Sequence, residues 1–247
     1  MSGRKAIRVT GTLLVAAGVL MLVWVLVVWR WQDPFTGLYT TWRQHQLSQS
    51  YDLRVREYRP LHRTASTAKA APSVTAAEIR AEARRYRLAS HRGEAIGRLR
   101  VPRLGLNMVL VDGTDDATLR KGPGLDRRTY MPGEGQLSYI AGHRTTYLAP
   151  FAHIERLRPG DPITIEVPYA TFVYRVYRHR IVTADELSVL RSHGREIVEL
   201  QACHPRFFAS HRYIVYGRLT RIDPRGARPI RASGRVLAAA PLASTQG

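Results

Sequence analysis

The most constraining feature of the sequence is an uncharged apolar segment near its start. From Gly11 to Trp29, nineteen residues carry no charged side chain and are mostly Leu, Val and Ala. A helix of that length spans roughly 28 Å, close to the ~30 Å hydrocarbon core of a bilayer. A cleaved signal peptide is the alternative, but its apolar core is usually shorter and ends in small residues. Because Trp29 and Trp31 are bulky and suit a membrane–water interface, we expect an uncleaved anchor.

Basic residues flank this segment unequally. Arg4, Lys5 and Arg8 precede it, whereas the twenty residues that follow it contain only Arg30 and Arg43. Cytoplasmic flanks of membrane helices carry the excess of Lys and Arg. We therefore expect a single-pass protein of the cell membrane, with a cytoplasmic N-terminus and an extracellular globular part.

Composition divides the chain into four segments. Residues 1–31 hold the cytoplasmic N-terminus and the anchor, and residues 32–93 are expected to be a stalk or linker with short helices. Residues 94–222 alone have the regular apolar pattern that a core requires. Residues 223–247 are rich in Arg, Pro and Ala without apolar periodicity, which predicts a disordered tail.

Two helices are predicted within the stalk. Residues 38–58 suit a polar helix, and Thr75-Ala-Ala-Glu78 is a capping-box pattern that opens a second helix ending near Ser90. Between them, residues 64–73 have the composition of a linker.

The globular segment shows short β-branched runs separated by Pro and Gly, and few helical patterns. Closely spaced strands of this kind predict an all-β barrel or sandwich. The expected strands are residues 95–101, 106–111, 137–141, 163–167, 171–182, 196–202 and 213–222, and the expected short helices are residues 115–121, 150–157 and 185–192.

The net charge of +19 is spread along the chain. Residues 94–222 hold nineteen basic and thirteen acidic residues without a long run of one sign. Two alternative explanations of the excess of basic residues stay open: a codon bias toward Arg, and an attraction to anionic headgroups or wall polymers. Since no localised basic patch is present, we expect no nucleic-acid partner.

A single cysteine, Cys203, excludes an internal disulfide framework and any zinc site built on several thiolates. It follows a strand-like run, and Pro205 ends that strand two residues later. A thiol at a strand end is accessible and is a good nucleophile. A buried structural cysteine is the more common fate of a lone cysteine, so the residues alone leave both readings open.

Nine histidines are available as a partner base, and composition does not choose among them. His204 adjoins Cys203, but neighbouring side chains of an extended strand point to opposite faces. His143 ends the run Tyr139-Ile-Ala-Gly142 and is the more attractive candidate, because a strand-end histidine beside a strand-end cysteine makes a nucleophile–base pair.

These residues carry a resemblance to a known family. Residues 122–151, around Ala141-Gly-His143, resemble the catalytic-histidine region of sortases, especially class E of actinobacteria. Residues 199–215 resemble the Cys-His-Pro region of the same family, with its arginine at Arg212, and residues 111–120 also fit. The resemblance covers roughly residues 94–222.

The resemblance implies an eight-stranded sortase-type β-barrel with a few short helices behind an N-terminal transmembrane helix. It implies a cysteine transpeptidase in which Cys203 forms a thioacyl enzyme. By the same resemblance, His143 would exchange protons with the thiol and the leaving amine, and Arg212 would donate hydrogen bonds to the substrate carbonyl or the developing oxyanion. We expect no cofactor and no metal, because the best acidic cluster, Asp112, Asp115 and Asp116 in a turn, suits the cap of a short helix.

Its implied partners are secreted proteins with a Leu-Ala-X-Thr-Gly or Leu-Pro-X-Thr-Gly-type C-terminal sorting signal, and the amine of a peptidoglycan precursor. We expect Tyr130, Thr145, Thr146 and Ala202 to line the substrate cleft. Ala202 stands where the family usually has a threonine. Two alternatives stay open: a sortase-like hydrolase, and a degenerate anchored wall-binding module.

Overall fold

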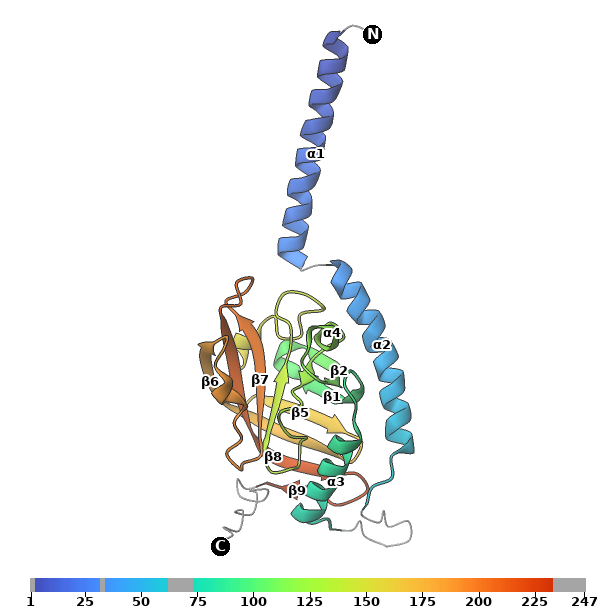
Figure 1. Ribbon diagram of the computed structural model, residues 1–247, viewed down its shortest axis with the longest axis vertical. Helices are drawn as coiled ribbons and strands as arrows, with labels where there is room; N and C mark the ends of the chain where they lie inside the picture. Colours follow the sequence, from blue (N-terminus) through green and yellow to red (C-terminus); the bar gives the residue numbers. More distant parts are fainter. Residues whose placement is uncertain (1–2, 32–33, 62–72, 233–247) are drawn as a thin grey trace.

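The computed structural model describes residues 3–31, 34–61 and 73–232, which form a β-barrel flanked by helices (Figure 1). Helix α1 (Gly3–Trp31) stands clear of the barrel. Within it, Lys5–Val27 is long and apolar enough to cross a membrane, with a mean hydropathy of 2.4 and no buried part. The helix ends beyond Trp29, whose side chain, like that of Trp31, lies outside the described residues.

Eight strands close into the barrel, in the order β6-β5-β1-β2-β3-β4-β7-β8 with β8 paired back to β6. A ninth strand, β9, extends the sheet from β8. The prediction of an all-β, eight-stranded sortase-type barrel is therefore confirmed. The strands are β1 Ala95–Val101, β2 Leu106–Asp112, β3 Gly124–Leu125, β4 Leu137–Ala141, β5 Pro162–Val167, β6 Ala170–Thr183, β7 Ile197–His204, β8 His211–Pro224 and β9 Ile230–Arg231.

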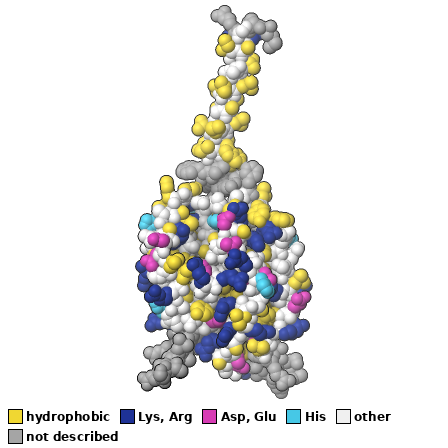
Figure 2. Space-filling view, in the orientation of Figure 1, with side chains coloured by type: hydrophobic (Ala, Val, Ile, Leu, Met, Phe, Trp, Pro, Cys, Tyr) yellow, Lys and Arg dark blue, Asp and Glu magenta, His cyan; other side chains and the backbone are white. Residues whose placement is uncertain are grey.

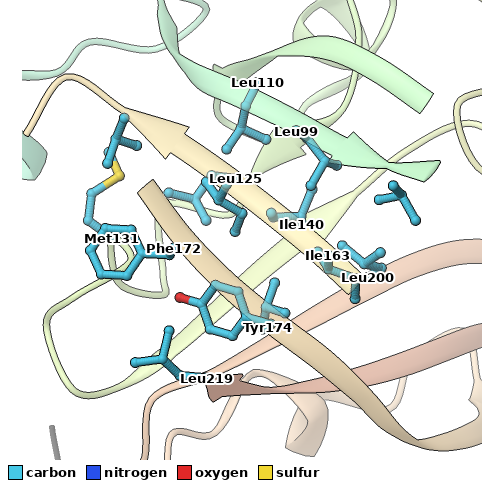
Figure 3. Close-up of a cluster of buried hydrophobic side chains, with 14 of the residues drawn as sticks. Leu99, Leu110, Leu125, Met131, Ile140, Ile163, Phe172, Tyr174, Leu200 and Leu219 are labelled. Atoms are coloured by element: carbon cyan, nitrogen blue, oxygen red, sulfur yellow. The ribbon is translucent and has the colours of Figure 1, made fainter. Parts of the chain in front are cut away.

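Apolar side chains from nearly every strand fill the barrel (Figure 3). Leu99, Leu110, Ile140, Phe172 and Leu200 are fully buried there. Each comes from a different strand, and side chains alternate between the two faces of a strand. Full burial of one such side chain contributes about 1.5–3 kcal/mol to the free energy of folding. Because every one of these strands buries an apolar side chain, their packing stabilises the closed barrel.

Strand positions follow the expected runs closely: β1 and β4 have the expected bounds, and the other expected strands differ by one or two residues at one or both ends. Strands β3 and β9 have two residues each, too few for a period to be read from the sequence. At the three places where short helices were expected, the structure has α4 (Asp116–Leu119) and the single 3₁₀ turns η2 (Ile154–Arg156) and η3 (Leu187–Leu190). A further 3₁₀ turn, η1 (Pro102–Leu104), was not expected.

The segment expected to be a stalk carries two helices that both contact the barrel. Helix α3 (Ala76–Ala89) begins with the expected capping box at Thr75, and the Tyr86 hydroxyl donates to the Ile96 carbonyl at 3.0 Å. Helix α2 (Pro34–Glu57) lies along β1 and β2. Its Tyr51 hydroxyl is buried and donates to the Glu166 carbonyl at 3.0 Å.

Two expected features fall largely outside the described residues: the linker at 64–73 and the tail beyond residue 232. The described beginning of the expected tail includes β9, which pairs with β8 through Ile222 and Ile230.

Candidate active site

Strand register brings the three candidate catalytic residues to one end of the barrel. Strands β4 and β7 run parallel, with Ala141 opposite Gln201. His143 and Cys203 each lie two residues beyond this pair, so they emerge side by side at the same barrel end. On the other side of β7, Arg212 of β8 is the direct antiparallel partner of Cys203. Neighbouring strands lie about 4.8 Å apart, so a reacting group above Cys203 has His143 on one side and Arg212 on the other.

The three side chains line one cavity of about 280 Å³. Its floor is the outer face of β4 and β7, and its walls are the loops around β3 and the β6–β7 connection with η3. The lining residues are Thr114, Leu119, Asp126, Arg128, Tyr139, Ala141, Gly142, His143, Ala184, Glu186, Leu187, Val189, Leu190, Gln201, Cys203 and Arg212.

Packing around His143 sets its charge. Burial lowers the pKa of His143 below its ordinary value of 6.5, and the nearby Arg120 acts in the same direction while Asp116 opposes both. Its ring centre lies 5.1 Å from that of Tyr147. Its Nε2 atom is buried without a hydrogen-bond partner among the described residues. At neutral pH the imidazole is therefore uncharged and able to accept a proton.

The glycine before His143 is required by close packing. A Cβ atom at Gly142 would lie 2.7 Å from the ring of Phe151. The Phe151 amide in turn donates to the His143 carbonyl at 3.1 Å. The loop that follows β4 thus folds back tightly on this turn and fixes the backbone that carries the imidazole.

The guanidinium of Arg212 is held by its own strand end. Its Nη1 atom donates to the Ala209 carbonyl at 2.7 Å and to the His211 carbonyl at 3.0 Å. These bonds orient a permanently charged donor group at the wall of the cavity.

Sequence reasoning missed Arg144, which joins the two strand ends of the site. Its Nη1 atom donates to the Cys203 carbonyl at 3.1 Å and to Nδ1 of His204 at 3.0 Å. Its Nη2 atom donates to the Glu155 carboxylate at 2.7 Å. The side chain is only 6% exposed. Arginine is common throughout the sequence, so residue type alone does not single out Arg144. Its place directly after His143 was the one signal that could have identified it.

A buried carboxylate organises the cavity wall opposite β7. Asp126 accepts hydrogen bonds from the Arg128 amide at 2.9 Å, from its guanidinium at 2.7 and 2.9 Å, and from the Thr114 hydroxyl at 3.0 Å. These partners lower the pKa of Asp126 although its burial opposes them. In the charged segment that follows Leu125, the charges of Asp126 and Arg128 therefore neutralise each other beside the cavity.

A second buried carboxyl lies on the cavity side of β7. Glu199 shares the outward face with Gln201 and Cys203, is 4% exposed, and has Tyr139 and Tyr216 as strand partners. Burial raises the pKa of Glu199 to about 8, against the weaker opposing effect of Arg178 and Arg180. At neutral pH this carboxyl is mostly protonated.

The four expected cleft residues lie apart from this cavity. The Tyr130 ring packs under the guanidinium of Arg87 from α3, 5.4 Å away. Thr145 and Thr146 follow His143 in the loop but do not line the cavity. Ala202 has no exposed surface and points into the barrel core, because strand alternation turns it away from the face of Cys203.

Within the described ranges, no three His, Cys, Asp or Glu side chains gather in a group that could hold a metal ion. His204 points to the other side of its strand from Cys203 and packs on Tyr213, with ring centres 5.8 Å apart. His204 is thus separated from the cavity, as expected for the residue next to Cys203 in a strand, because neighbouring side chains point to opposite faces.

Comparison with known proteins gives one family. The family model of the Sortase domain matches residues 99–220. Sortase D of Bacillus subtilis is 32% identical over 130 residues, which cover 51% of this chain and 64% of that protein. Sortase SrtE1 of Streptomyces coelicolor is 30% identical over 155 residues, covering 54% and 42%. The chain thus spans less than two thirds of the length of these curated relatives.

A solved structure agrees with these sequence matches. The crystal structure of sortase E1 from Streptomyces coelicolor with a tripeptide in the active site superposes with a TM-score of 0.51 and 27% identity. The match covers 56% of this chain and 94% of that one. With the barrel topology, the family match shows that residues 99–220 of this chain form a sortase domain.

Proposed function

We propose that this chain is a membrane-anchored, class E-like sortase. It cleaves the C-terminal sorting signal of secreted proteins through a thioacyl intermediate on Cys203 and transfers the acyl group to a cell-wall amine. The observation that carries the proposal is the strand register: the only thiol of the chain lies between His143 and Arg212 at the edge of one cavity.

In the first half-reaction, His143 accepts the thiol proton, and the sulfur of Cys203 attacks the carbonyl carbon of the scissile peptide. The lowered pKa of His143 supports this role, because an uncharged imidazole is present at neutral pH. Arg212 donates hydrogen bonds to the oxygen that becomes negative. The protonated His143 then gives its proton to the leaving amine as the C–N bond breaks.

In the second half-reaction an amine of a peptidoglycan precursor attacks the thioester. His143 removes a proton from that amine, a new amide bond forms, and the thiol of Cys203 is restored. The net reaction is a transpeptidation and consumes no cofactor.

The remaining assignments are also proposals. The resemblance of residues 122–151 and 199–215 to class E sortases supports a preference for Leu-Ala-X-Thr-Gly over Leu-Pro-X-Thr-Gly. Arg4, Lys5 and Arg8 before α1 support a cytoplasmic N-terminus and an extracellular barrel. We assign residues 1–31 to the anchor and residues 94–222 to the catalytic domain.

The test uses the full chain in detergent micelles with both peptides, with and without an amine acceptor, followed by mass spectrometry. We expect an acyl adduct on Cys203 with either peptide, in larger yield with Leu-Ala-X-Thr-Gly. Addition of the amine should convert the adduct into ligated product.

Two variants serve as controls. Cys203→Ala should form no adduct, and His143→Ala should lose more than about 10²-fold in rate because it lacks the general base. His91→Ala changes an exposed histidine outside the cavity lining and should match the wild type. An adduct on Cys203→Ala, or none on the wild type, contradicts the nucleophile assignment. Hydrolysis that the amine leaves unchanged contradicts transfer and supports the hydrolase alternative.

A further inference from the structure

Helix α2 fixes the distance between the barrel and the candidate membrane helix. Gln44 donates to the Lys121 carbonyl at 2.8 Å and accepts from the Val109 amide at 2.7 Å. Only two residues separate Trp31, the end of α1, from Pro34, the start of α2. That length of chain reaches at most roughly 11 Å. When α1 spans a bilayer, the barrel end beside the first turn of α2 must lie close to the bilayer surface.

The same barrel end carries the active-site loops. The Tyr147 amide, in the loop after β4, donates to the Thr36 hydroxyl of α2 at 3.0 Å. Because β4 and β7 are parallel, the connection that follows β7 emerges at this end as well. Figure 1 shows this connection rising beside the base of α1.

Large apolar side chains protrude from this end of the barrel. Phe207 and Phe208, in the β7–β8 connection, are 68% and 81% exposed. Leu148 is exposed in the loop after β4, and Figure 2 shows hydrophobic side chains standing out on both sides of the base of α1. We call the following residues the lipid-facing surface: Leu38, Tyr39, Trp42, Leu148, Phe207 and Phe208.

Arginines accompany the aromatic residues of this surface. The guanidinium of Arg43 lies 5.5 Å from the centre of the Trp42 ring, and that of Arg206 lies 5.6 Å from the Phe207 ring. Aromatic rings with adjacent cations are typical of the membrane–water interface, where the cations attract anionic headgroups.

We propose that the lipid-facing surface rests on the phospholipid bilayer around α1, with Phe207 and Phe208 entering the boundary between headgroups and acyl chains. The inference rests on the membrane anchoring of the proposed function. It also concerns the active site, because the Ala209 carbonyl in the same connection holds the guanidinium of Arg212. The cavity then opens next to the headgroups.

The test measures depth in lipid with a fluorescent label. The full chain with Cys203→Ala and one new cysteine, Phe208→Cys, is labelled with an environment-sensitive dye. It is then reconstituted into vesicles of equal parts phosphatidylcholine and phosphatidylglycerol containing lipids spin-labelled near the headgroup. The matched control is Leu88→Cys on α3, which is likewise apolar and largely exposed, at 68% against 81% for Phe208, but lies away from α1.

We expect the label at position 208 to lose most of its fluorescence to the spin-labelled lipid, and the label at position 88 to lose almost none. Equal quenching at the two positions, or no quenching at 208, overturns the proposal. A label at 208 that responds to the sorting peptide in detergent but not to lipid also overturns it, because the loop then binds substrate instead.

A preceding flotation step separates the two levels of inference. Failure of the protein to float with the vesicles contradicts α1 as an anchor, and with it the proposed function. Flotation with an unquenched label at 208 contradicts only the lipid-facing surface. No outcome depends on enzymatic activity, because the Cys203→Ala background is inactive by design.

Discussion

Strand β7 has two faces that differ in what they contact. Val198, Leu200 and Ala202 point into the barrel and are fully buried among apolar side chains. Glu199 and Cys203 point outward, to the face where the cavity lies. The inward face makes only apolar packing contacts with the barrel core. The outward face instead places Cys203 beside Arg212 and buries Glu199, whose Oε2 atom has no hydrogen-bond partner among the described residues.

The contrast teaches where substitutions should act. The inward face contributes to the free energy of folding, since burial of apolar area is its whole role. The outward face contains a thiol, which matters for the chemistry, and a buried carboxyl, which makes stability depend on pH. Three substitutions test this division.

The largest expected effect is on the inward face. Leu200→Ala removes a fully buried side chain and should lower the free energy of unfolding by about 2–5 kcal/mol. Urea denaturation measures the change. The control is Gln201→Ala on the outward face, which should cost less than about 1 kcal/mol. If the two substitutions cost the same, the division between faces is wrong.

A substitution of Glu199 on the outward face should raise the free energy of unfolding at high pH, whereas Leu200→Ala lowers it. The pKa of Glu199 in the folded protein, about 8, exceeds its ordinary value of 4.5. The folded protein therefore holds a proton that the unfolded chain releases as pH rises between these values. The contribution of Glu199 to stability is complete below pH 4.5 and is lost as pH rises through 8.

Glu199→Gln should consequently stabilise the protein on the order of 2 kcal/mol at pH 9 and change it little at pH 5. Thermal unfolding at the two pH values checks this, with Glu186→Gln as the control, a half-buried carboxylate of the cavity lining that accepts from the Ser188 amide at 3.1 Å. A stabilisation independent of pH would show that the carboxyl is ionised throughout.

The smallest expected effect concerns the end of β7. Arg144→Lys keeps the positive charge but cannot reach the Cys203 carbonyl, His204 and Glu155 together. We expect about a 10-fold lower kcat with little change in KM, because Arg144 positions the strand end without touching substrate. Arg156→Lys, an exposed neighbour on η2, should change neither constant. A higher KM at unchanged kcat would instead indicate substrate binding.

Much of this molecule follows from local sequence pattern. The apolar segment that forms α1, the capping box at Thr75 and most of the strands are predicted because each depends on residues close together in the chain. Cys203 and His143 also stand out locally, as reactive residues at strand ends.

Only the tertiary structure decided which strand ends meet. The parallel pairing of β4 with β7 joins segments some sixty residues apart and brings Arg144 against the Cys203 carbonyl. Pairing also turned Ala202 into the core and left Tyr130 beside α3. The physical reason is that strand period is a property of a few consecutive residues. Strand pairing and helix docking instead minimise the free energy of the whole barrel, including the docking of α2 beside the active-site loops.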